Sequence, residues 1–360
     1  MTVSNSVIRQ AIHSGNPVID GNQVTLIWEG QTAPTIIGDF NNWDTSSTKF
    51  KRISPRLIPD SSKSIWYATL AFPRDAYIEY AFHDPVTQKN FTDPLNKRTV
   101  NNGIGGRNNY FYMPETMQSP FSLRRADVTP GALTRHIVDA GPLRQEYERT
   151  VYLYRPPVKE PVPLLVVYDG LEYVHRGKLP TIVDNMIADR RIQPLAMALL
   201  PGGGRWRTLE YHCSDATLQW LKQTILPLAN EQLNLIDIQE HPGTYGVLGA
   251  SSGAIMALYT GLRLPTFFGK VLSQSGVSSW GGHEFVNVDL VKHKHSIDIR
   301  TWMDVGTLDF LLEDNRQMSA LMRENGYNVS YREYSGGHNY TTWRDDLWRG
   351  LEEMFPYIPR

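Results

Sequence analysis

The chain has 360 residues, of which 41% are hydrophobic and 20% charged, enough to bury a large core. Its 36 basic residues balance 37 acidic ones, so no basic surface favours nucleic acid, and we expect a small-molecule partner. The only cysteine, Cys213, excludes an intramolecular disulfide and a cysteine-based zinc cluster. We expect neither a metal nor another cofactor.

The first residues contain no basic segment followed by an apolar one, so no signal peptide is predicted. No run approaches the roughly 18 apolar residues of a membrane span. We therefore expect a cytoplasmic protein that does not bind a membrane. The oligomeric state is left open.

Short strands separated by turn residues are predicted between residues 21 and 114. They alternate apolar and polar residues and are rich in aromatics, as strands are. The pattern predicts a small all-β sandwich, which we place in a domain of residues 1–118. Its strands are "QVTLIWEG", "PTIIGDF", "IWYATLAF", "AYIEYAFHD" and "NNYFYMP".

Strand and helix signals alternate in the second predicted domain, residues 119–360. An antiparallel pair, "ALTRHIVDA" and "RTVYLYRPP", comes first, and near-continuous apolar strands follow, as in a sheet covered on both faces. This order predicts an α/β fold with a mainly parallel central sheet. The apolar strands are "PLLVVYDG", "PLAMALL", "TYGVLGA", "GKVLSQSG", "IRTWMDVGT" and "VSYREYSGG".

A tight turn between a predicted strand and a predicted helix contains the motif Gly249-Ala-Ser-Ser-Gly253. It matches G-x-S-x-G, which exposes a nucleophilic serine at the end of a sheet. Ser251 is then the nucleophile, and the main-chain N–H of Ser252 is a donor to an oxyanion. The alternative is an ordinary strand–helix turn whose small residues serve packing.

A base must accept the proton of a serine nucleophile. Among ten histidines, His338 follows a strand and two glycines at the opening of the last predicted helix. His212 is the main rival, and a solvent-exposed histidine in a turn is the alternative for His338.

A carboxylate between the serine and the histidine should orient the base. Asp309 follows a predicted strand and is our candidate, although it could instead cap a helix. The order Ser251, Asp309, His338 is that of α/β-hydrolases. The other carboxylates considered for this role are Asp304, Glu313 and Asp314.

Further residues are candidates for binding the substrate. The N–H of Leu171, after "YDG", is a second oxyanion donor, unless this segment is only a tight turn. Arg205 and Arg207, beside Trp206 on a glycine-rich loop, suit an aromatic or anionic acyl group, with salt bridging to Glu210 as the alternative. Trp280 and Trp343 are expected either to line the site that binds the acyl group or to pack in the core.

The motifs around these residues resemble the esterase family that includes ferric enterochelin esterases and, more distantly, feruloyl and acetylxylan esterases. The similar segments are "YDGLEY", "RTLEYHC", "GASSGAIMALYTGLRLPTFFGKVLSQSG", "GTLDFLLEDN", "SGGHNYTTWRDDL" and, in the first half, "DPLNKR". "IIGDFNNWD" resembles early-set immunoglobulin-like domains, including glycogen-binding modules. Ser252-Gly253-Ala254 departs from the bulky residue and two glycines that tend to follow the nucleophile in enterochelin esterases.

The resemblance implies hydrolysis of carboxylic esters through an acyl-serine, with a catecholate trilactone as one candidate substrate. A carbohydrate esterase of the feruloyl or acetylxylan type is the first alternative. The second is a glycan-binding protein with an inactive hydrolase domain, in which Trp28, Trp43 and Trp66 would stack on sugars.

Overall fold

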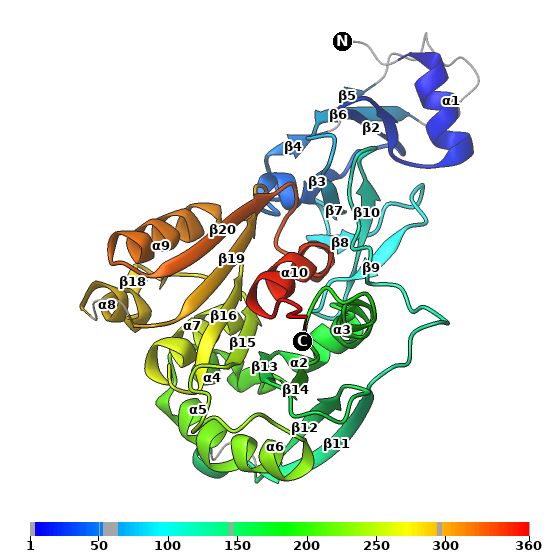
Figure 1. Cartoon of the computed structure of the whole chain (residues 1–360). Coiled ribbons are helices and arrows are strands. Elements are labelled where there is room, and N and C mark those ends of the chain that lie inside the picture. The colour runs from blue at the N-terminus through cyan, green and yellow to red at the C-terminus, as the bar shows by residue number, and fades with distance from the viewer. Residues whose placement is uncertain (1–3, 50, 53–63, 144–146, 294–296, 360) are drawn as a thin grey trace. The chain divides into compact units, whose positions relative to one another are not determined.

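The computed structural model describes residues 4–49, 51–52, 64–143, 147–293 and 297–359 (Figure 1). Internal packing divides the chain into two units. The first comprises Met1–Met117 with two short later segments, Gly306–Phe310 and Tyr334–Asn339. The second comprises Gln118–Val305, Leu311–Glu333 and Tyr340–Arg360. This grouping by contacts is not a test of the domain limits at residues 118 and 119, which stay a prediction.

The first unit is built on β-sheets, as the alternating pattern predicts. One sheet has the strand order β1-β2-β6-β5, and the other has the order β4-β3-β7-β10-β9 with β8 paired to β7. An N-terminal helix, α1 (Asn5–Ser14), was not predicted; Ser4 caps its first turn. The strands are β1 (Val18–Asp20), β2 (Gln23–Glu29), β3 (Thr35–Gly38), β4 (Thr48–Lys49), β5 (Lys51–Arg52), β6 (Ile65–Ala71), β7 (Tyr77–Asp84), β8 (Lys89–Phe91), β9 (Thr99–Asn101) and β10 (Arg107–Tyr112).

Strand β7 runs through the centre of this unit and is buried on both faces. Ile78, Tyr80 and Phe82 point into the hydrophobic core, because side chains alternate along a strand. Glu79, on the opposite face, is also buried. A short helical turn, η1 (Asp39–Asn41), follows β3 beside it.

The second unit contains the eight-stranded sheet β11-β12-β14-β13-β15-β16-β19-β20. The pair β11–β12 and the pair β12–β14 are antiparallel, whereas the pairs β14–β13, β13–β15, β15–β16 and β16–β19 are parallel. The predicted antiparallel first pair of strands and the mainly parallel sheet are therefore confirmed. The strands are β11 (Ala132–Asp139), β12 (Glu148–Arg155), β13 (Leu164–Tyr168), β14 (Ala196–Leu200), β15 (Tyr245–Ala250), β16 (Phe268–Gln274), β19 (Arg300–Gly306) and β20 (Asn328–Tyr334), and a separate hairpin joins β17 (Ser279–Trp280) to β18 (His283–Glu284).

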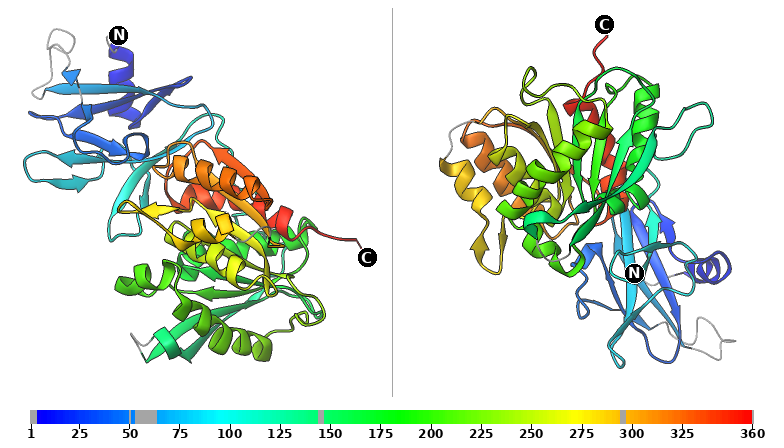
Figure 2. Two further views of the ribbon diagram at one scale, coloured as in Figure 1. Left: turned by 90° about the vertical axis from the view of Figure 1, so that its left-hand side faces the viewer. Right: turned by 90° about the horizontal axis from the view of Figure 1, so that it is seen from below.

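Helices form two packed groups around this sheet (Figure 2). One group contains α2 (Gly170–His175), α3 (Leu179–Ala188) and α10 (Tyr340–Met354). The other contains α4 (Arg207–Tyr211), α7 (Ser252–Arg263), α8 (Val286–His293) and α9 (Leu312–Glu324), with α5 (Asp215–Trp220) contacting α4. The apolar spacing of residues 216–233 is helical, and this segment forms α5, a π turn (η5, Leu221–Ile225) and α6 (Leu226–Gln232) in direct succession. The short turns are η3 (Gly141–Leu143) and η4 (Gly204–Trp206).

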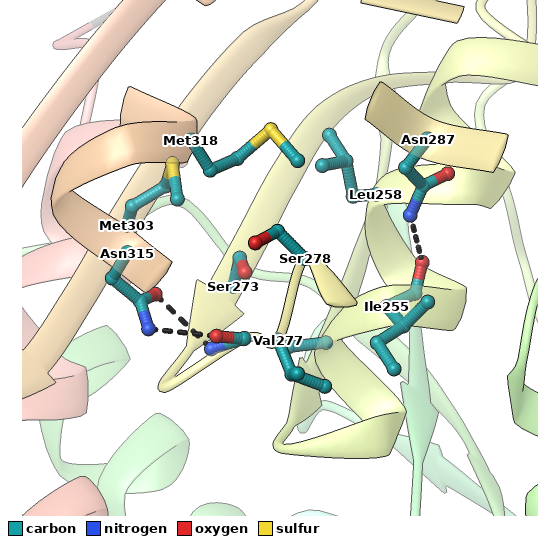
Figure 3. Close-up of a pocket in the computed structure, with 11 residues that line it drawn as sticks. Ile255, Leu258, Ser273, Val277, Ser278, Asn287, Met303, Asn315 and Met318 are labelled. Carbon is teal, nitrogen blue, oxygen red and sulfur yellow. Dashed lines mark hydrogen bonds between the residues drawn. The ribbon is translucent and has the colours of Figure 1, made fainter. Parts of the chain in front are cut away.

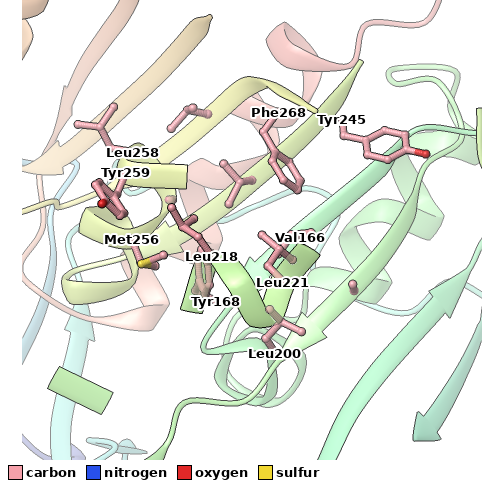
Figure 4. Packing of buried hydrophobic residues seen from close by; sticks show 14 of the residues in the cluster. Val166, Tyr168, Leu200, Leu218, Leu221, Tyr245, Met256, Leu258, Tyr259 and Phe268 are labelled. Atoms are coloured by element: carbon pink, nitrogen blue, oxygen red, sulfur yellow. The ribbon is translucent and has the colours of Figure 1, made fainter. Parts of the chain in front are cut away.

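The core of the second unit is made by the inner strands and the helices against them (Figure 4). Val166 and Tyr168 of β13 pack with Leu200 of β14 and Met256 of α7 in one cluster. The Tyr168 hydroxyl bonds Thr260 Oγ1 at 2.8 Å, which satisfies two buried polar groups. Helix α7 is therefore fixed against the sheet. None of the helices in the described residues has the length and apolarity required to cross a membrane.

Candidate active site

Ser251 lies at the sharp turn between β15 and α7. Its backbone has φ 56° and ψ −124°, a strained conformation for a residue with a side chain. The Ser251 N–H donates to the carbonyl of Gln274 at 2.9 Å, which holds the turn to the next strand. A Cβ at Gly249 would lie 2.1 Å from the carbonyl oxygen of Gly253, so only glycine fits this approach of strand and helix. The backbone has the shape expected for a nucleophile turn.

The two expected oxyanion donors lie at helix starts on one edge of the sheet. Ser252 is the first residue of α7, and Leu171 is the second residue of α2. These helices follow β15 and β13, which are paired in parallel, with Val167 opposite Leu248. Their first N–H groups have no partner within the helix and carry partial positive charge. Two groups of donors therefore open at the same edge.

A buried ion pair fixes the start of α2. The Asp169 carboxylate, 7% exposed, accepts hydrogen bonds from Nε and Nη2 of Arg207 at 2.8 and 2.6 Å. Burial raises the pKa of Asp169 above its usual value, and the neighbouring Arg207 offsets only part of this rise. Asp169 has φ 53°, and its N–H donates to the Tyr211 hydroxyl at 3.0 Å. Arg207 thus neutralises a carboxylate beside the expected oxyanion donors.

The other proposed substrate residues have different surroundings. Arg205 is exposed and stacks on the ring of Trp206, 4.8 Å from its centroid. Trp280 lies in β17, and its side chain is outside the described residues. Trp343 is buried, and its indole N–H donates to Ser275 Oγ at 2.9 Å. Substrate contact by these residues, as by Arg207, stays a prediction.

Glu210 does not pair with the arginines of the glycine-rich loop. Its carboxylate accepts from Arg149 of β12, with Oε1 2.5 Å from Nη1 and Oε2 3.2 Å from Nη2. Both side chains are buried. Arg149 also donates to the carbonyl of Pro201 at 3.2 Å, so this pair fixes the beginning of the loop.

Asp309 and His338 meet in the first unit. His338 Nδ1 lies 2.9 Å from Oδ2 and 3.1 Å from Oδ1 of Asp309. The Asp309 side chain is 0% exposed, whereas that of His338 is 18% exposed. Helix α9 begins at Leu312 with Leu311 in the N-cap position, so Asp309 is not its cap. A buried carboxylate hydrogen-bonded to Nδ1 orients the imidazole ring, which is the arrangement expected for the acid and base of a catalytic triad.

The other carboxylates considered for the acid make different contacts. Asp304 is fully buried and accepts from Gln274 Nε2 and Trp302 Nε1. Burial and the nearby Asp346 raise the pKa of Asp304 to about 8. Asp314 accepts from the N–H of Ser278 at 3.2 Å.

His212, the rival base, packs against another aromatic residue. Its ring centroid lies 4.8 Å from that of Phe285. Burial and then Arg207 lower the pKa of His212. Glu313, the remaining carboxylate, accepts from Gln317 on the exposed side of α9.

A small pocket that no sequence motif predicts lies beside α7 (Figure 3). Asn315 of α9 exchanges two hydrogen bonds with the main chain of Gly276, at 2.7 and 3.1 Å. Asn287 donates to the carbonyl of Ile255 at 2.9 Å. The lining is mostly apolar and comprises Ala254, Ile255, Leu258, Ser273, Gly276, Val277, Ser278, Asn287, Met303, Asn315 and Met318.

Phe310 is a further residue that sequence reasoning missed. Its side chain follows Asp309, is 52% exposed and has its ring centroid 4.7 Å from that of His338. An exposed aromatic ring beside the candidate base is available to a ligand. Across the described ranges, no group of three or more His, Cys, Asp or Glu side chains is arranged to hold a metal ion.

The comparisons with known proteins agree with this architecture. Residues 144–354 match the model of the family described as "Putative esterase". An iron(III) enterobactin esterase of Escherichia coli O6:H1 is 25% identical over 277 residues, 73% of this chain and 67% of that protein. The corresponding Dickeya dadantii protein is 25% identical over 250 residues, 62% of this chain, and the match spans only 55% of the Dickeya protein.

A solved structure extends the similarity across both units. The enterobactin esterase of Shigella flexneri, crystallised in the presence of enterobactin, has a TM-score of 0.76 and 21% identity, and 92% of each chain is covered. At this identity the likeness shows the fold, which is an all-β region followed along the chain by an α/β-hydrolase, as predicted. Because the family model covers more than half of the residues, the chain belongs to this esterase family.

Proposed function

We propose that the chain hydrolyses carboxylic esters through an acyl-serine intermediate on Ser251. His338 is the general base and Asp309 its orienting carboxylate. The N–H groups of Ser252 and Leu171 stabilise the oxyanion. The family supports ester hydrolysis, and the serine mechanism and the substrate are our proposals.

The observation that carries this proposal is the contact between Asp309 and His338. A buried carboxylate 2.9 Å from Nδ1 favours the tautomer that keeps the proton on Nδ1, so Nε2 can accept one. It also stabilises the imidazolium formed when Nε2 is protonated. The strained backbone of Ser251 supports its role as the partner nucleophile. The proposal requires His338 Nε2 to reach Ser251 Oγ during the reaction.

The chemistry takes place in two steps. Ser251 Oγ attacks the ester carbonyl while His338 takes its proton, and the tetrahedral oxyanion is held by main-chain N–H groups. Collapse breaks the bond to the alcohol, which leaves with the proton from His338. Water then attacks the acyl-serine in the same way, and the acid is released.

We further propose that the acyl group is aromatic. Phe310 offers an exposed ring beside the base, on which an aryl ester can stack. The relatives from Dickeya and Escherichia are called enterobactin esterases, which favours a catecholate trilactone as the substrate class. A feruloyl ester of a carbohydrate would use the same surface and is the alternative.

Binding of a glycan without catalysis has weaker support. Trp28 Nε1 donates to the carbonyl of Thr32, and Trp66 Nε1 donates to that of Gly30. The Trp28 ring also packs edge-on against Phe82 and Phe91. These indoles therefore contribute to the packing of the sandwich.

Pre-steady-state hydrolysis of p-nitrophenyl acetate tests the mechanism. We expect a burst of p-nitrophenol close to one equivalent in the wild type, and its loss in Ser251→Ala and in His338→Ala. A full burst in Ser251→Ala would refute the acyl-serine. Ser252→Ala is the matched control and should retain the burst, because only its main-chain N–H is used.

Substrate choice is tested by comparing kcat/KM for a catecholate trilactone, methyl ferulate and short alkanoyl esters. Preference for the trilactone supports the siderophore class, and preference for methyl ferulate supports the carbohydrate esterase. A preference for alkanoyl esters over both aromatic substrates would refute the aromatic acyl group.

A further inference from the structure

A buried aspartate of the β-sandwich contacts the loop that carries His338. Asp39 begins the turn η1 after β3 and is 3% exposed. Its Oδ2 accepts from the N–H of Glu79 at 2.8 Å and from Nδ2 of Asn339 at 3.3 Å. The carboxyl group therefore joins β7 to the residue that directly follows His338.

The residue before His338 touches the same carboxyl group. A Cβ built on Gly337 would lie 2.1 Å from Asp39 Cγ and 2.3 Å from Oδ1. Glycine is thus the only residue that lets the main chain approach this closely. Asp39 contacts the loop on both sides of His338, through the backbone of Gly337 and the side chain of Asn339.

The rest of the loop is tied to the sandwich and to the acid. The N–H of Tyr77, the first residue of β7, donates to the carbonyl of Ser335 at 3.1 Å. The N–H of Leu308 donates to the carbonyl of Gly336 at 2.9 Å, and Leu308 packs against the sandwich core. The segments of Asp309 and His338 therefore belong, by their packing, to the first unit.

We propose that Asp39 is a positioning residue for His338, so that the β-sandwich sets the orientation of the base. This inference rests on the proposed function of His338. Asp39 acts through the loop and does not touch the reacting atoms. Burial and the carboxylates of Glu79 and Asp309 raise the pKa of Asp39 well above its usual value, which agrees with a packed, weakly hydrated contact.

The test compares kcat and KM for a p-nitrophenyl ester in Asp39→Ala and Asp39→Asn. The alanine variant loses the acceptor on the loop, so kcat should fall about 10- to 100-fold, as for a small displacement of a catalytic group, with KM nearly unchanged. The asparagine oxygen can accept both N–H bonds in the same volume, so this variant should retain most of kcat.

Asp93→Ala provides the matched control. Asp93 is equally buried in the same unit and accepts from Tyr80 and Asn16, but among the residues that the structure describes none of its hydrogen bonds reaches the histidine loop. It should lose stability and, at a temperature where it is folded, keep kcat. Wild-type kcat in Asp39→Ala, or an equal loss of kcat in Asp93→Ala, would overturn the proposal.

Asn339→Ala separates positioning from a failure to fold. It removes the donor on the loop and leaves Asp39 in place, so kcat should fall in this variant even if Asp39→Ala does not fold. Unchanged kcat in Asn339→Ala together with an unfolded Asp39→Ala would reject the proposal. If His338→Ala itself remains active, the proposed function fails. If His338→Ala is inactive but the Asp39 variants keep the wild-type rate, only the positioning role of Asp39 fails.

Discussion

Replacement of Arg207 by methionine tests the ion pair beside the expected oxyanion donors. The change keeps much of the aliphatic stem and leaves the buried Asp169 without its two charged donors. Removing one partner from a fully buried pair costs about 3–5 kcal/mol. Because the Arg207 side chain is 33% exposed, we expect a smaller loss of about 2–3 kcal/mol in the free energy of unfolding.

Thermal unfolding followed by circular dichroism measures this loss. For a unit of this size it corresponds to a fall in Tm of about 5–10 °C. Arg191→Met is the matched control, because Arg191 forms a similar two-bond pair with Glu352 at the surface. An exposed pair contributes about 0–1 kcal/mol, so its Tm should change little. The double variant Asp169→Asn/Arg207→Met should regain part of the loss.

Equal Tm values for the two single variants would refute this reasoning. The comparison also tests the expectation that Arg207 binds substrate. A residue with only that role would raise KM in Arg207→Met and leave Tm unchanged. The ion pair instead predicts that Tm falls in Arg207→Met, whether or not KM rises.

Three further changes probe the site. Asp309→Asn should reduce kcat about 10³- to 10⁴-fold with little change in KM, because the amide no longer favours the productive His338 tautomer. Gly249→Ala should abolish the burst and lower Tm, because its Cβ would meet the backbone of Gly253 at 2.1 Å. Asp304, whose pKa is raised to about 8, keeps a proton in the folded protein that the unfolded chain loses above about pH 4. Its contribution to stability therefore declines as pH rises from about 4 to 8, and Asp304→Asn should remove that decline in urea titrations at pH 5 and 8.

Each of these three predictions would be contradicted by one particular result. Wild-type kcat in Asp309→Asn would remove Asp309 from the mechanism. A folded, fully active Gly249→Ala would mean that the turn can relax. If the stability difference between pH 5 and pH 8 is the same in Asp304→Asn as in the wild type, Asp304 does not titrate in this window.

Local patterns predicted most of the fold. The strand "TYGVLGA" and the turn around Ser251 could be identified because apolar runs and glycine flanks are consecutive in sequence. The helical spacing of residues 216–233 gave no sign of the π turn η5, which lies just before Pro227, a residue with no N–H to donate within the helix. Helix α1 was missed, although Ser4 provides a capping signal at its start.

The ion-pair and hydrogen-bond partners of the buried carboxylates were harder to predict from the sequence. Glu210 was considered as the partner of the neighbouring arginines because it is close in the chain, yet it pairs with Arg149, 61 residues earlier. Asp39 and Asn339 are 300 residues apart, and only the folded chain brings them together. A buried ion pair depends on tertiary contacts, whereas spacing within a segment reports only local neighbours.

Labelling with a fluorophosphonate, followed by mass spectrometry of the intact and digested protein, tests most directly whether Ser251 is a nucleophile activated by His338. We expect a single adduct on the peptide that contains Ser251, and a labelling rate at least about 100-fold lower in His338→Ala. An adduct on another residue, or labelling of Ser251 at the same rate without His338, would contradict the proposed mechanism.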